Sequence, residues 1–384
     1  MRWDIFCTVI DNFGDIGVTW RLARQLAAEH SINVRLWVDD LAAFQRIRPE
    51  IDPGIDAQTL QGVDIRRWTS PLPPVTPGDV VIEALACTLP DDFKTAMAAR
   101  NPAPVWINLE YLTAEAWADG VHALPSQHPR LPLIQHFFVP GFSPRTGGLT
   151  REAGLPAARD AFRADAAAQA RFWLDLRLPP AVPGVLQVSL FSYENAALPG
   201  LLDAWANSPR PLRVCVPEGK ALAEIAAWLG QPMLRAGDIH LRGALQLCVL
   251  PMLDQDAYDR LLWACDLNLV RGEDSFLRAQ FAGRPMLWQA YRQDAGAHHA
   301  KVSAFLEHYL AALDPAVADT LRMLYEHWNH ESPIDQAWPD WLATLPALNA
   351  HAQAWAEHLV EMPDLAANLM IFCEKLAKTQ GENG

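Results

Sequence analysis

The chain has 384 residues, of which 51% are hydrophobic and 20% charged, and it carries a net charge of −14. This length exceeds what one hydrophobic core usually supports, so two domains are expected. An acidic chain without a basic stripe is repelled by phosphate backbones, which argues against a nucleic-acid role. Since no apolar segment approaches bilayer-spanning length and the first residues enter a strand pattern directly, we expect a soluble, cytoplasmic protein with no membrane role.

The first half of the chain alternates between strand and helix patterns. The expected strands are 3–10, 33–39, 79–86 and 103–112, and the expected helices are 19–29, 91–100 and 157–178. Residues 122–156 are rich in Pro, Gly and His and are expected to form a long loop that lines a site. Alternation of this kind predicts a parallel sheet with helices on both faces.

A second alternating unit follows the segment PPAVPG at 179–184, which is expected to link two domains. Its expected strands are 185–193, 212–219, 245–253, 267–272 and 285–291, and the pattern is helical from about 295. We therefore predict an α/β protein with two Rossmann-like domains that face each other across a cleft. The expected domains are 1–178 and 179–360. Residues 361–384 are expected to form a C-terminal helix that can pack back on the first domain.

The cysteines and histidines indicate neither disulfides nor a metal site. The six cysteines are scattered through apolar segments and form no CxxC pair, and the histidines show no metal-ligand spacing. Reduced thiols in the core are the expected state.

The loop after the first strand, VIDNFGDIGV, holds two carboxylates, Asp11 and Asp15. Ligands of open α/β sheets bind at the carboxyl ends of strands, where this loop is expected to lie. Gly14 and Gly17 are expected to let the backbone turn tightly there. The alternative interpretation is that the two acids simply cap a turn and a helix.

A second strand–turn–helix unit, LNLVRGEDSFLRAQFAG, occupies 267–283. Ser275 is expected to cap the helix, whose free N–H groups together with Arg271 would bind phosphate oxygens. Glu273 and Asp274 would repel phosphate and suit the hydroxyls of a sugar or ribose. Ordinary helix capping is the alternative.

Aromatic side chains end an earlier strand, where Phe191 and Tyr193 lie in VSLFSYENAAL. At a strand end such rings can stack on a base, although core packing is the alternative.

Five motifs together resemble one known family: VIDNFGDIGVTWRLARQLA, INLEYLTAEAW, FFVPGFSPRTGGLTRE, SLFSYEN and DQDAYDRLLWACDLNLVRGEDSFLRAQFAG. They are similar to the EarP family, the bacterial protein-arginine rhamnosyltransferases that act on translation elongation factor P. The resemblance spans nearly the whole chain. It implies a GT-B fold, with the acceptor site in the first domain and the donor site in the second. It also implies dTDP-β-L-rhamnose as donor, inverting transfer to one arginine of elongation factor P, and relief of ribosome stalling at polyproline stretches, with no cofactor.

The resemblance also assigns roles to residues of this chain. Asp15 corresponds to the catalytic aspartate, and Asp11 matches a second important acid. The implied acceptor loop contains Asn12, Phe13, Gly14 and Gly17. The implied donor-binding residues are Phe191, Tyr193, Gln255, Arg271, Glu273, Asp274 and Ser275. Met252 and Leu253 stand where the family has a phenylalanine, so the second face of the thymine sandwich is left unassigned.

The acceptor chemistry explains why two acids are useful in one loop. A guanidinium has a pKa above about 12 and is a poor nucleophile. One carboxylate can orient it while the other takes a proton as the C–N bond forms. Glu110, at another strand end, is the next candidate base. Arg271 and the helix dipole can neutralise the diphosphate leaving group, so no metal is expected.

Three rival interpretations remain open from the residues alone. A nicotinamide-dependent dehydrogenase would need G-x-G-x-x-G after the first strand, whereas only Gly14 and Gly17 stand there. A binding protein without chemistry could use the tryptophan-rich segment 323–345 as an interface, although such residues are more often core. A transferase of the same fold could use a different sugar, because rhamnose is implied by the resemblance only.

Overall fold

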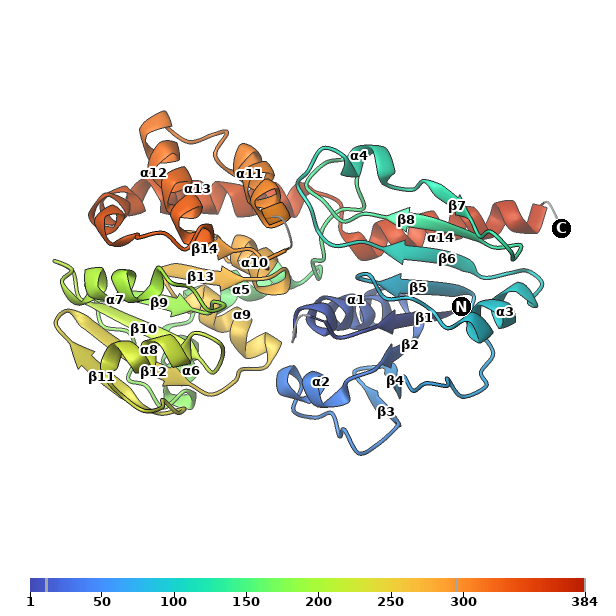
Figure 1. Cartoon of the computed structure of the whole chain (residues 1–384), viewed down its shortest axis with the longest axis horizontal. Helices are drawn as coiled ribbons and strands as arrows, with labels where there is room; N and C mark the ends of the chain where they lie inside the picture. Colours follow the sequence, from blue (N-terminus) through green and yellow to red (C-terminus); the bar gives the residue numbers. More distant parts are fainter. Residues whose placement is uncertain (11–12, 294–295, 383–384) are drawn as a thin grey trace. The chain divides into compact units, whose positions relative to one another are not determined.

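The computed structural model describes residues 1–10, 13–293 and 296–382, which form two compact units (Figure 1). The first unit comprises Met1–Ala153 and Met362–Gly384, and the second comprises Gly154–Glu361. Each unit is built on its own open, mostly parallel sheet with helices packed against it. The predicted fold class, α/β with two Rossmann-like domains, is thus confirmed.

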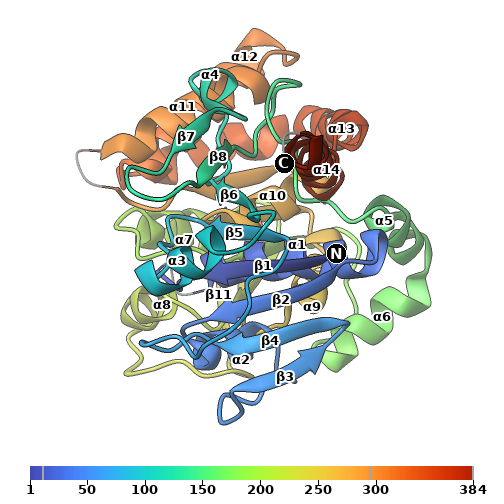
Figure 2. The same cartoon turned by 90° about the vertical axis from the view of Figure 1, so that its right-hand side faces the viewer.

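The first unit contains an eight-stranded sheet in the order β3-β4-β2-β1-β5-β6-β8-β7. Figure 2 shows this sheet from β3 at the bottom to β8 near the top. Only the edge strands β3 and β7 pair antiparallel. The strands are β1 (Arg2–Cys7), β2 (Asn33–Val38), β3 (Ala57–Leu60), β4 (Val63–Arg67), β5 (Val80–Ala84), β6 (Val105–Leu109), β7 (Pro125–Gln127) and β8 (Ile134–Phe138). The helices are α1 (Gly14–His30), α2 (Leu41–Ile47), α3 (Asp91–Ala98), α4 (Ala118–Val121) and α14 (Leu365–Glu382).

The central strands of this sheet are buried on both faces, which explains their continuous apolar runs. All five residues of β5 are buried, as are five of the six in β1. Asp4 is a buried charged residue within the otherwise apolar stretch of β1. Its carboxylate accepts hydrogen bonds from Arg35 Nε at 2.5 Å, Trp37 Nε1 at 3.1 Å and Gly78 N at 2.6 Å. A buried charge needs such partners, and here they tie β1 to its neighbours.

The second unit contains a six-stranded sheet in the order β11-β12-β10-β9-β13-β14, in which only β11 is antiparallel. The strands are β9 (Leu186–Leu190), β10 (Leu212–Pro217), β11 (Ile239–Arg242), β12 (Leu245–Leu250), β13 (Leu267–Arg271) and β14 (Met286–Gln289). The helices are α5 (Leu155–Ala164), α6 (Ala166–Asp175), α7 (Leu198–Ala206), α8 (Leu222–Leu229), α9 (Gln255–Ala264), α10 (Asp274–Phe281), α11 (Ala297–Tyr309), α12 (Pro315–Asn329) and α13 (Trp338–Glu361).

The boundary predicted at 178 is wrong, because α5 and α6 belong to the second unit. Arg159 Nη1 on α5 donates to the Phe281 carbonyl at 2.8 Å, and Arg163 donates to the Ala282 carbonyl. The guanidinium of Arg213, on β10, lies 4.3 Å from the ring centroid of Trp173 on α6. These contacts fix both helices to the second sheet, so the segment 179–184 lies inside this unit and does not link the domains.

The chain returns to the first unit after Glu361. Leu149 N donates to the Pro363 carbonyl at 3.2 Å, and Leu365 N donates to the Leu149 carbonyl at 2.9 Å. Gly148 has φ +84°, and a Cβ there would lie 2.2 Å from the Pro363 oxygen. Only glycine permits this close approach. The chain then continues into α14, a helix that packs against α1.

Three other local predictions differ from the structure. The expected loop 122–156 contains β7 and β8, with β8 parallel to β6. The expected single helix 157–178 is two helices, because the Asp165 side chain accepts hydrogen bonds from Ala167 N and Ala168 N and starts a new helix. The short strands β3, β4 and β11 were not predicted. The edge strands β3 and β11 have exposed residues and so carry a weak pattern, and β4 has only five residues, three of them charged.

The core accounts for the cysteines and for the tryptophan-rich segment. All six cysteines are free and buried, as predicted. Trp328, Trp338 and Trp341 are at most 1% exposed, so segment 323–345 is core and offers no aromatic interface. None of the helices in the described ranges is both long and apolar enough to span a membrane.

Candidate functional site

The first unit holds a buried carboxylate, Asp15, in the first turn of α1, where the chain leaves the carboxyl end of β1. Its side chain is 1% exposed. Oδ2 accepts a hydrogen bond from Ile10 N at 2.7 Å, and Oδ1 accepts one from the Tyr111 hydroxyl at 3.1 Å. A helix N-terminus favours negative charge, so Asp15 is a held, oriented carboxylate at the edge of the sheet.

Tyr111, which the sequence did not single out, joins two further strand ends to this site. It follows β6, and its hydroxyl lies 3.2 Å from the Leu85 carbonyl as well as near Asp15. Leu85 and Ala86, directly after β5, have φ +56° and +63°. Left-handed backbone at two consecutive residues other than glycine is uncommon and concentrates at functional sites. The only sequence signal for Tyr111 was its place in NLEYL at a strand end.

The structure describes only part of the rest of the acidic loop, and it differs there from the predicted turn. Asp11 and Asn12 lie outside the described residues. Phe13 is the N-cap residue of α1, and its carbonyl accepts a hydrogen bond from Gly17 N at 2.9 Å. Gly14 begins α1 and Gly17 lies in its first turns, so both have helical backbone and the expected tight turn at these glycines is wrong. The predicted helix start at 19 was therefore too late.

The alternative base, Glu110, lies next to Tyr111. It is half-buried, and its Oε1 accepts a hydrogen bond from Asn108 Nδ2 at 3.2 Å. Its backbone N–H donates to the Phe138 carbonyl at 3.0 Å, which fixes the residue between β6 and β8.

The second unit holds a buried cation, Arg271, at the carboxyl end of β13. The side chain is 6% exposed, and its Cζ lies 4.3 Å from the Phe191 ring centroid and 4.5 Å from that of Tyr193. Cation–π contacts of this kind stabilise a desolvated guanidinium. Among the described residues, Nη1 has no hydrogen-bond partner although it is buried. The arrangement leaves one strong donor available for a ligand.

The loop between β13 and α10 is held by its own backbone and by β14. The Ser275 hydroxyl accepts from Arg271 N at 3.1 Å and donates to the Arg271 carbonyl. Gly272 has φ +60°, and its carbonyl accepts from Trp288 Nε1 at 2.7 Å. Glu273, not Ser275, is the N-cap residue of α10, and it makes no side-chain cap. The predicted Ser275 cap is wrong, because the helix begins two residues earlier than a Ser275 cap requires and the hydroxyl closes the turn instead.

Other donor-site candidates meet at the starts of α9 and α10. Gln255 is the first residue of α9, and its Nε2 donates to Asp274 Oδ2 at 3.1 Å. A buried ion pair fixes the two helices: Arg278 Nη2 lies 2.6 Å from Asp259 Oδ2, and Nε lies 3.1 Å from Oδ1. The sequence did not identify this pair, because its partners are distant along the chain and carry no motif.

Tyr258 is a further residue that the sequence missed. Its ring centroid lies 5.5 Å from that of Phe191, and burial raises the pKa of its phenol, which therefore stays neutral. Leu253 is buried and Met252 is half-buried. Phe191 thus has Arg271 and Tyr258 as neighbours, and Tyr193 N donates to Gln289 Oε1 at 2.9 Å. The seven predicted donor residues gather at the ends of β9 and β13 and the starts of α9 and α10.

The described residues of the two sites form no metal-ligand cluster. Within the described ranges, no three His, Cys, Asp or Glu side chains lie close enough together to hold a metal ion.

Two Rossmann-like units, each with candidate binding side chains at the carboxyl ends of its strands, give the chain a GT-B fold, the fold class of many glycosyltransferases. A UDP-glucosyltransferase from Polygonum tinctorium has a similar fold, with a TM-score of 0.54 at 13% identity over 99% of this chain and 98% of that one.

The chain belongs to the EarP family, described as elongation-factor P (EF-P) rhamnosyltransferase, whose sequence profile matches residues 3–374. It is 50% identical to a protein-arginine rhamnosyltransferase of Pseudomonas putida over 351 residues, covering 91% of this chain and 93% of the relative. A protein of the same name from Shewanella oneidensis is 42% identical over 379 residues, covering 91% and 94%. A solved structure on EarP-mediated arginine glycosylation of EF-P has a TM-score of 0.71 at 38% identity, covering 97% and 99%. This membership sets aside the dehydrogenase alternative.

Proposed function

We propose that this chain transfers L-rhamnose from dTDP-β-L-rhamnose to the guanidinium of one arginine of EF-P, with inversion at the anomeric carbon. The product is EF-P activated to relieve ribosome stalling at polyproline stretches, which places the enzyme in the cytoplasm. The observation that best supports donor binding in the second unit is the buried Arg271, whose Nη1 is available beside Phe191 and Tyr193. Family membership supports the sugar, the acceptor residue and the partner.

The donor would bind in the second unit. Arg271 Nη1 would donate to a diphosphate oxygen, and the N-terminus of α10 would add its positive dipole end. Phe191 and Tyr193 would contact thymine with the ring surfaces that Arg271 leaves uncovered. Glu273 and Asp274, at the start of α10, would accept hydrogen bonds from sugar hydroxyls, with Gln255 holding Asp274 in place.

These groups would also stabilise the leaving group without a metal. As the glycosidic C–O bond breaks, negative charge accumulates on the departing dTDP. Arg271 would be a fixed cation for this charge, since it is buried and its guanidinium packs against the rings of Phe191 and Tyr193. No cofactor is therefore included in the proposal.

The acceptor reaction would use Asp15 in the first unit. A guanidinium nitrogen attacks the anomeric carbon from the face opposite dTDP, which departs with the electron pair of the C–O bond. The nitrogen loses a proton as the C–N bond forms, and Asp15 accepts it. Because Ile10 N and the Tyr111 hydroxyl hold the two Asp15 oxygens, the carboxylate meets the substrate in one orientation. Asp11 is proposed to orient the guanidinium. A single displacement of this kind inverts the anomeric configuration.

Intact-mass measurement tests the proposal. The purified chain is incubated with whole EF-P and, separately, dTDP-rhamnose, UDP-glucose or GDP-mannose. We expect a gain of one deoxyhexose only with dTDP-rhamnose, and none on EF-P whose acceptor arginine is replaced by lysine. NMR of the product assigns the anomeric configuration. A gain with another donor, or none with dTDP-rhamnose, would contradict the proposed substrate.

A further inference from the structure

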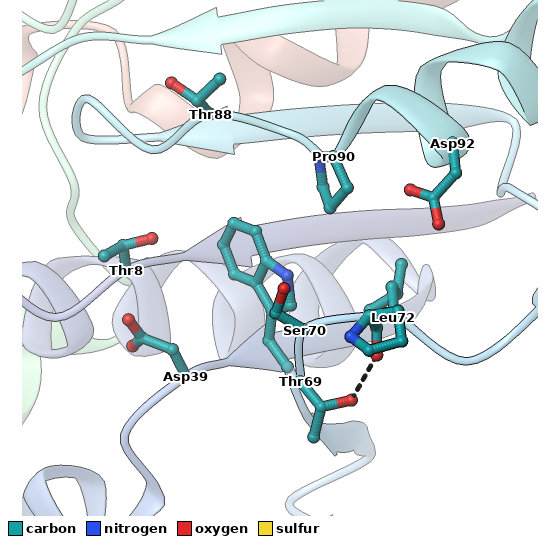
Figure 3. A pocket seen from close by; sticks show the side chains of 10 residues that line it. Thr8, Asp39, Thr69, Ser70, Leu72, Thr88, Pro90 and Asp92 are labelled. Carbon is teal, nitrogen blue, oxygen red and sulfur yellow. Dashed lines mark hydrogen bonds between the residues drawn. The ribbon is translucent and has the colours of Figure 1, made fainter.

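The first unit contains a pocket of about 510 Å³ that the transfer chemistry does not use (Figure 3). It lies where β1, β2, β4 and β5 end, at the same edge of the sheet as Asp15. The lining residues are Thr8, Asp39, Trp68, Thr69, Ser70, Pro71, Leu72, Thr88, Pro90 and Asp92. Its place at the carboxyl ends of parallel strands is where α/β sheets bind ligands.

The pocket has negative charge available for a ligand. Asp39 Oδ1 accepts from Val9 N at 2.9 Å, and Asp92 Oδ1 accepts from Phe93 N at 2.8 Å. Within the described ranges, neither Oδ2 atom makes a hydrogen bond, and both side chains are exposed. In Figure 3, Asp39 lies beside Thr8, and Asp92 lies beyond Pro90. The lining set contains no lysine, arginine or histidine to offset these two charges.

An aromatic side chain completes the pocket. The half-buried Trp68 makes a T-shaped contact with Phe6, with ring centroids 5.2 Å apart and an interplanar angle of 80°. Its remaining surface lines the pocket. Figure 3 shows Asp39 and Asp92 at opposite ends of the lining, so a cationic side chain can lay its stem on the indole and pair its head with one of the two acids. The same carboxylates repel a nucleoside diphosphate.

One backbone segment connects this pocket to the proposed catalytic carboxylate. Val9 N donates to Asp39, and the next amide, Ile10 N, donates to Asp15 at 2.7 Å. Consecutive amides therefore bond one carboxylate of the pocket and the carboxylate proposed as base. A protein that presents its arginine to Asp15 also presents neighbouring side chains to this edge of the sheet.

We propose that the pocket binds a second basic side chain of the acceptor protein, a lysine or an arginine that is not itself glycosylated. The inference rests on the proposed function, since the occupant belongs to the protein that carries the acceptor arginine. The chain's net charge is −14, which favours contact with a basic side chain of a partner. The pocket sets affinity for the protein acceptor and leaves the chemical step unchanged.

A matched pair of double variants tests the inference. Asp39→Asn with Asp92→Asn removes both charges, while each amide oxygen still accepts from Val9 N or Phe93 N. The control is Asp40→Asn with Asp91→Asn, which removes the same charge from the adjacent positions outside the pocket. Asp40 caps α2 through Ala43 N at 2.9 Å, and asparagine caps equally well. Asp91, whose side chain is 78% exposed, pairs with Lys94 Nζ at 2.8 Å, and an ion pair with a solvent-exposed carboxylate contributes little.

Initial rates with whole EF-P give the expected result. The pocket variant should raise the KM for EF-P about fivefold, the upper size of one exposed charge pair. Its kcat and its KM for dTDP-rhamnose should stay within about twofold of wild type, as should all parameters of the control. A pocket variant with unchanged KM overturns the inference. A lower kcat at unchanged KM also overturns it, because the acids would then act only through the Asp15 loop.

Binding of EF-P without donor separates this inference from the proposed function. Titration calorimetry reports the affinity of each variant for EF-P whether or not transfer occurs. Loss of affinity in the pocket variant alone supports the pocket even if wild type transfers a different sugar, and equal affinities refute it. Alanine substitution of each EF-P lysine and arginine should then identify one whose effect disappears in the pocket variant.

Discussion

Replacing Arg271 by lysine separates the charge of this side chain from its shape. Lysine keeps the positive charge but cannot place a planar group between Phe191 and Tyr193, where the guanidinium carbon lies 4.3 and 4.5 Å from the ring centroids. It also lacks Nη1, the buried donor without a partner among the described residues. Because a hydrogen bond to a charged group contributes about 1.5–3 kcal/mol, we expect dTDP to bind about 10- to 150-fold more weakly.

Calorimetric titration with dTDP and with thymidine provides the assay. Thymidine lacks the diphosphate, so its affinity should change less than about threefold, whereas that of dTDP should fall as stated. The matched control is Arg242→Lys in the same unit, where the guanidinium lies 4.2 Å from the Trp228 ring centroid at an exposed site. That variant should bind both ligands normally. Unchanged dTDP affinity in Arg271→Lys, or equal losses for dTDP and thymidine, would refute a diphosphate role for Arg271.

Three further outcomes are expected. Tyr111→Phe should lower kcat about tenfold with unchanged dTDP affinity, because Asp15 loses the hydrogen bond from the Tyr111 hydroxyl, worth about 1–2 kcal/mol. Steady-state rates check this, and a normal kcat would show that this hydrogen bond does not position the carboxylate. Phe191→Ala should weaken the binding of dTDP and of thymidine alike by ~1–3 kcal/mol, the cost of losing a stacking face. If calorimetry finds a loss of affinity for dTDP alone, the thymine ring does not stack on Phe191. Transfer should proceed at the same rate after EDTA treatment, and restoration of lost activity by added Mg²⁺ would contradict a leaving group stabilised by Arg271.

Local sequence patterns were sufficient to predict the two sheets and to place the candidate carboxylate and cation at strand ends. A continuous apolar strand such as β5 can be recognised without tertiary information, because its pattern depends on neighbours in the chain. The same holds for Asp15, shortly after β1, and for Arg271, the last residue of β13. Asp15 and Arg271 were identified for this reason. The resemblance added the roles of Phe191, Tyr193 and Gln255, which an isolated aromatic or amide pattern does not distinguish from core.

Features that depend on distant contacts could not be predicted. Tyr111 reaches Asp15 across 96 positions of sequence, and Arg278 pairs with Asp259 only because α9 and α10 lie side by side. The domain boundary was misplaced because carbonyl groups of the second unit hold Arg159 and Arg163, and nothing near α5 in the sequence indicates that contact. The pocket beside Asp39 likewise forms from four strand ends that are separate in the sequence.

The central claim is that Asp15 accepts the proton while the other unit holds the donor, and Asp15→Asn tests it most directly. Asparagine keeps the shape and can still accept from Ile10 N or the Tyr111 hydroxyl, but it cannot take a proton at the reacting nitrogen. Intact mass of EF-P over time should show transfer slowed by about 10²–10⁴. The melting temperature and the dTDP isotherm should match wild type, and Glu110→Gln should transfer normally. Near-normal turnover by Asp15→Asn would contradict the account and make Glu110 the next candidate base.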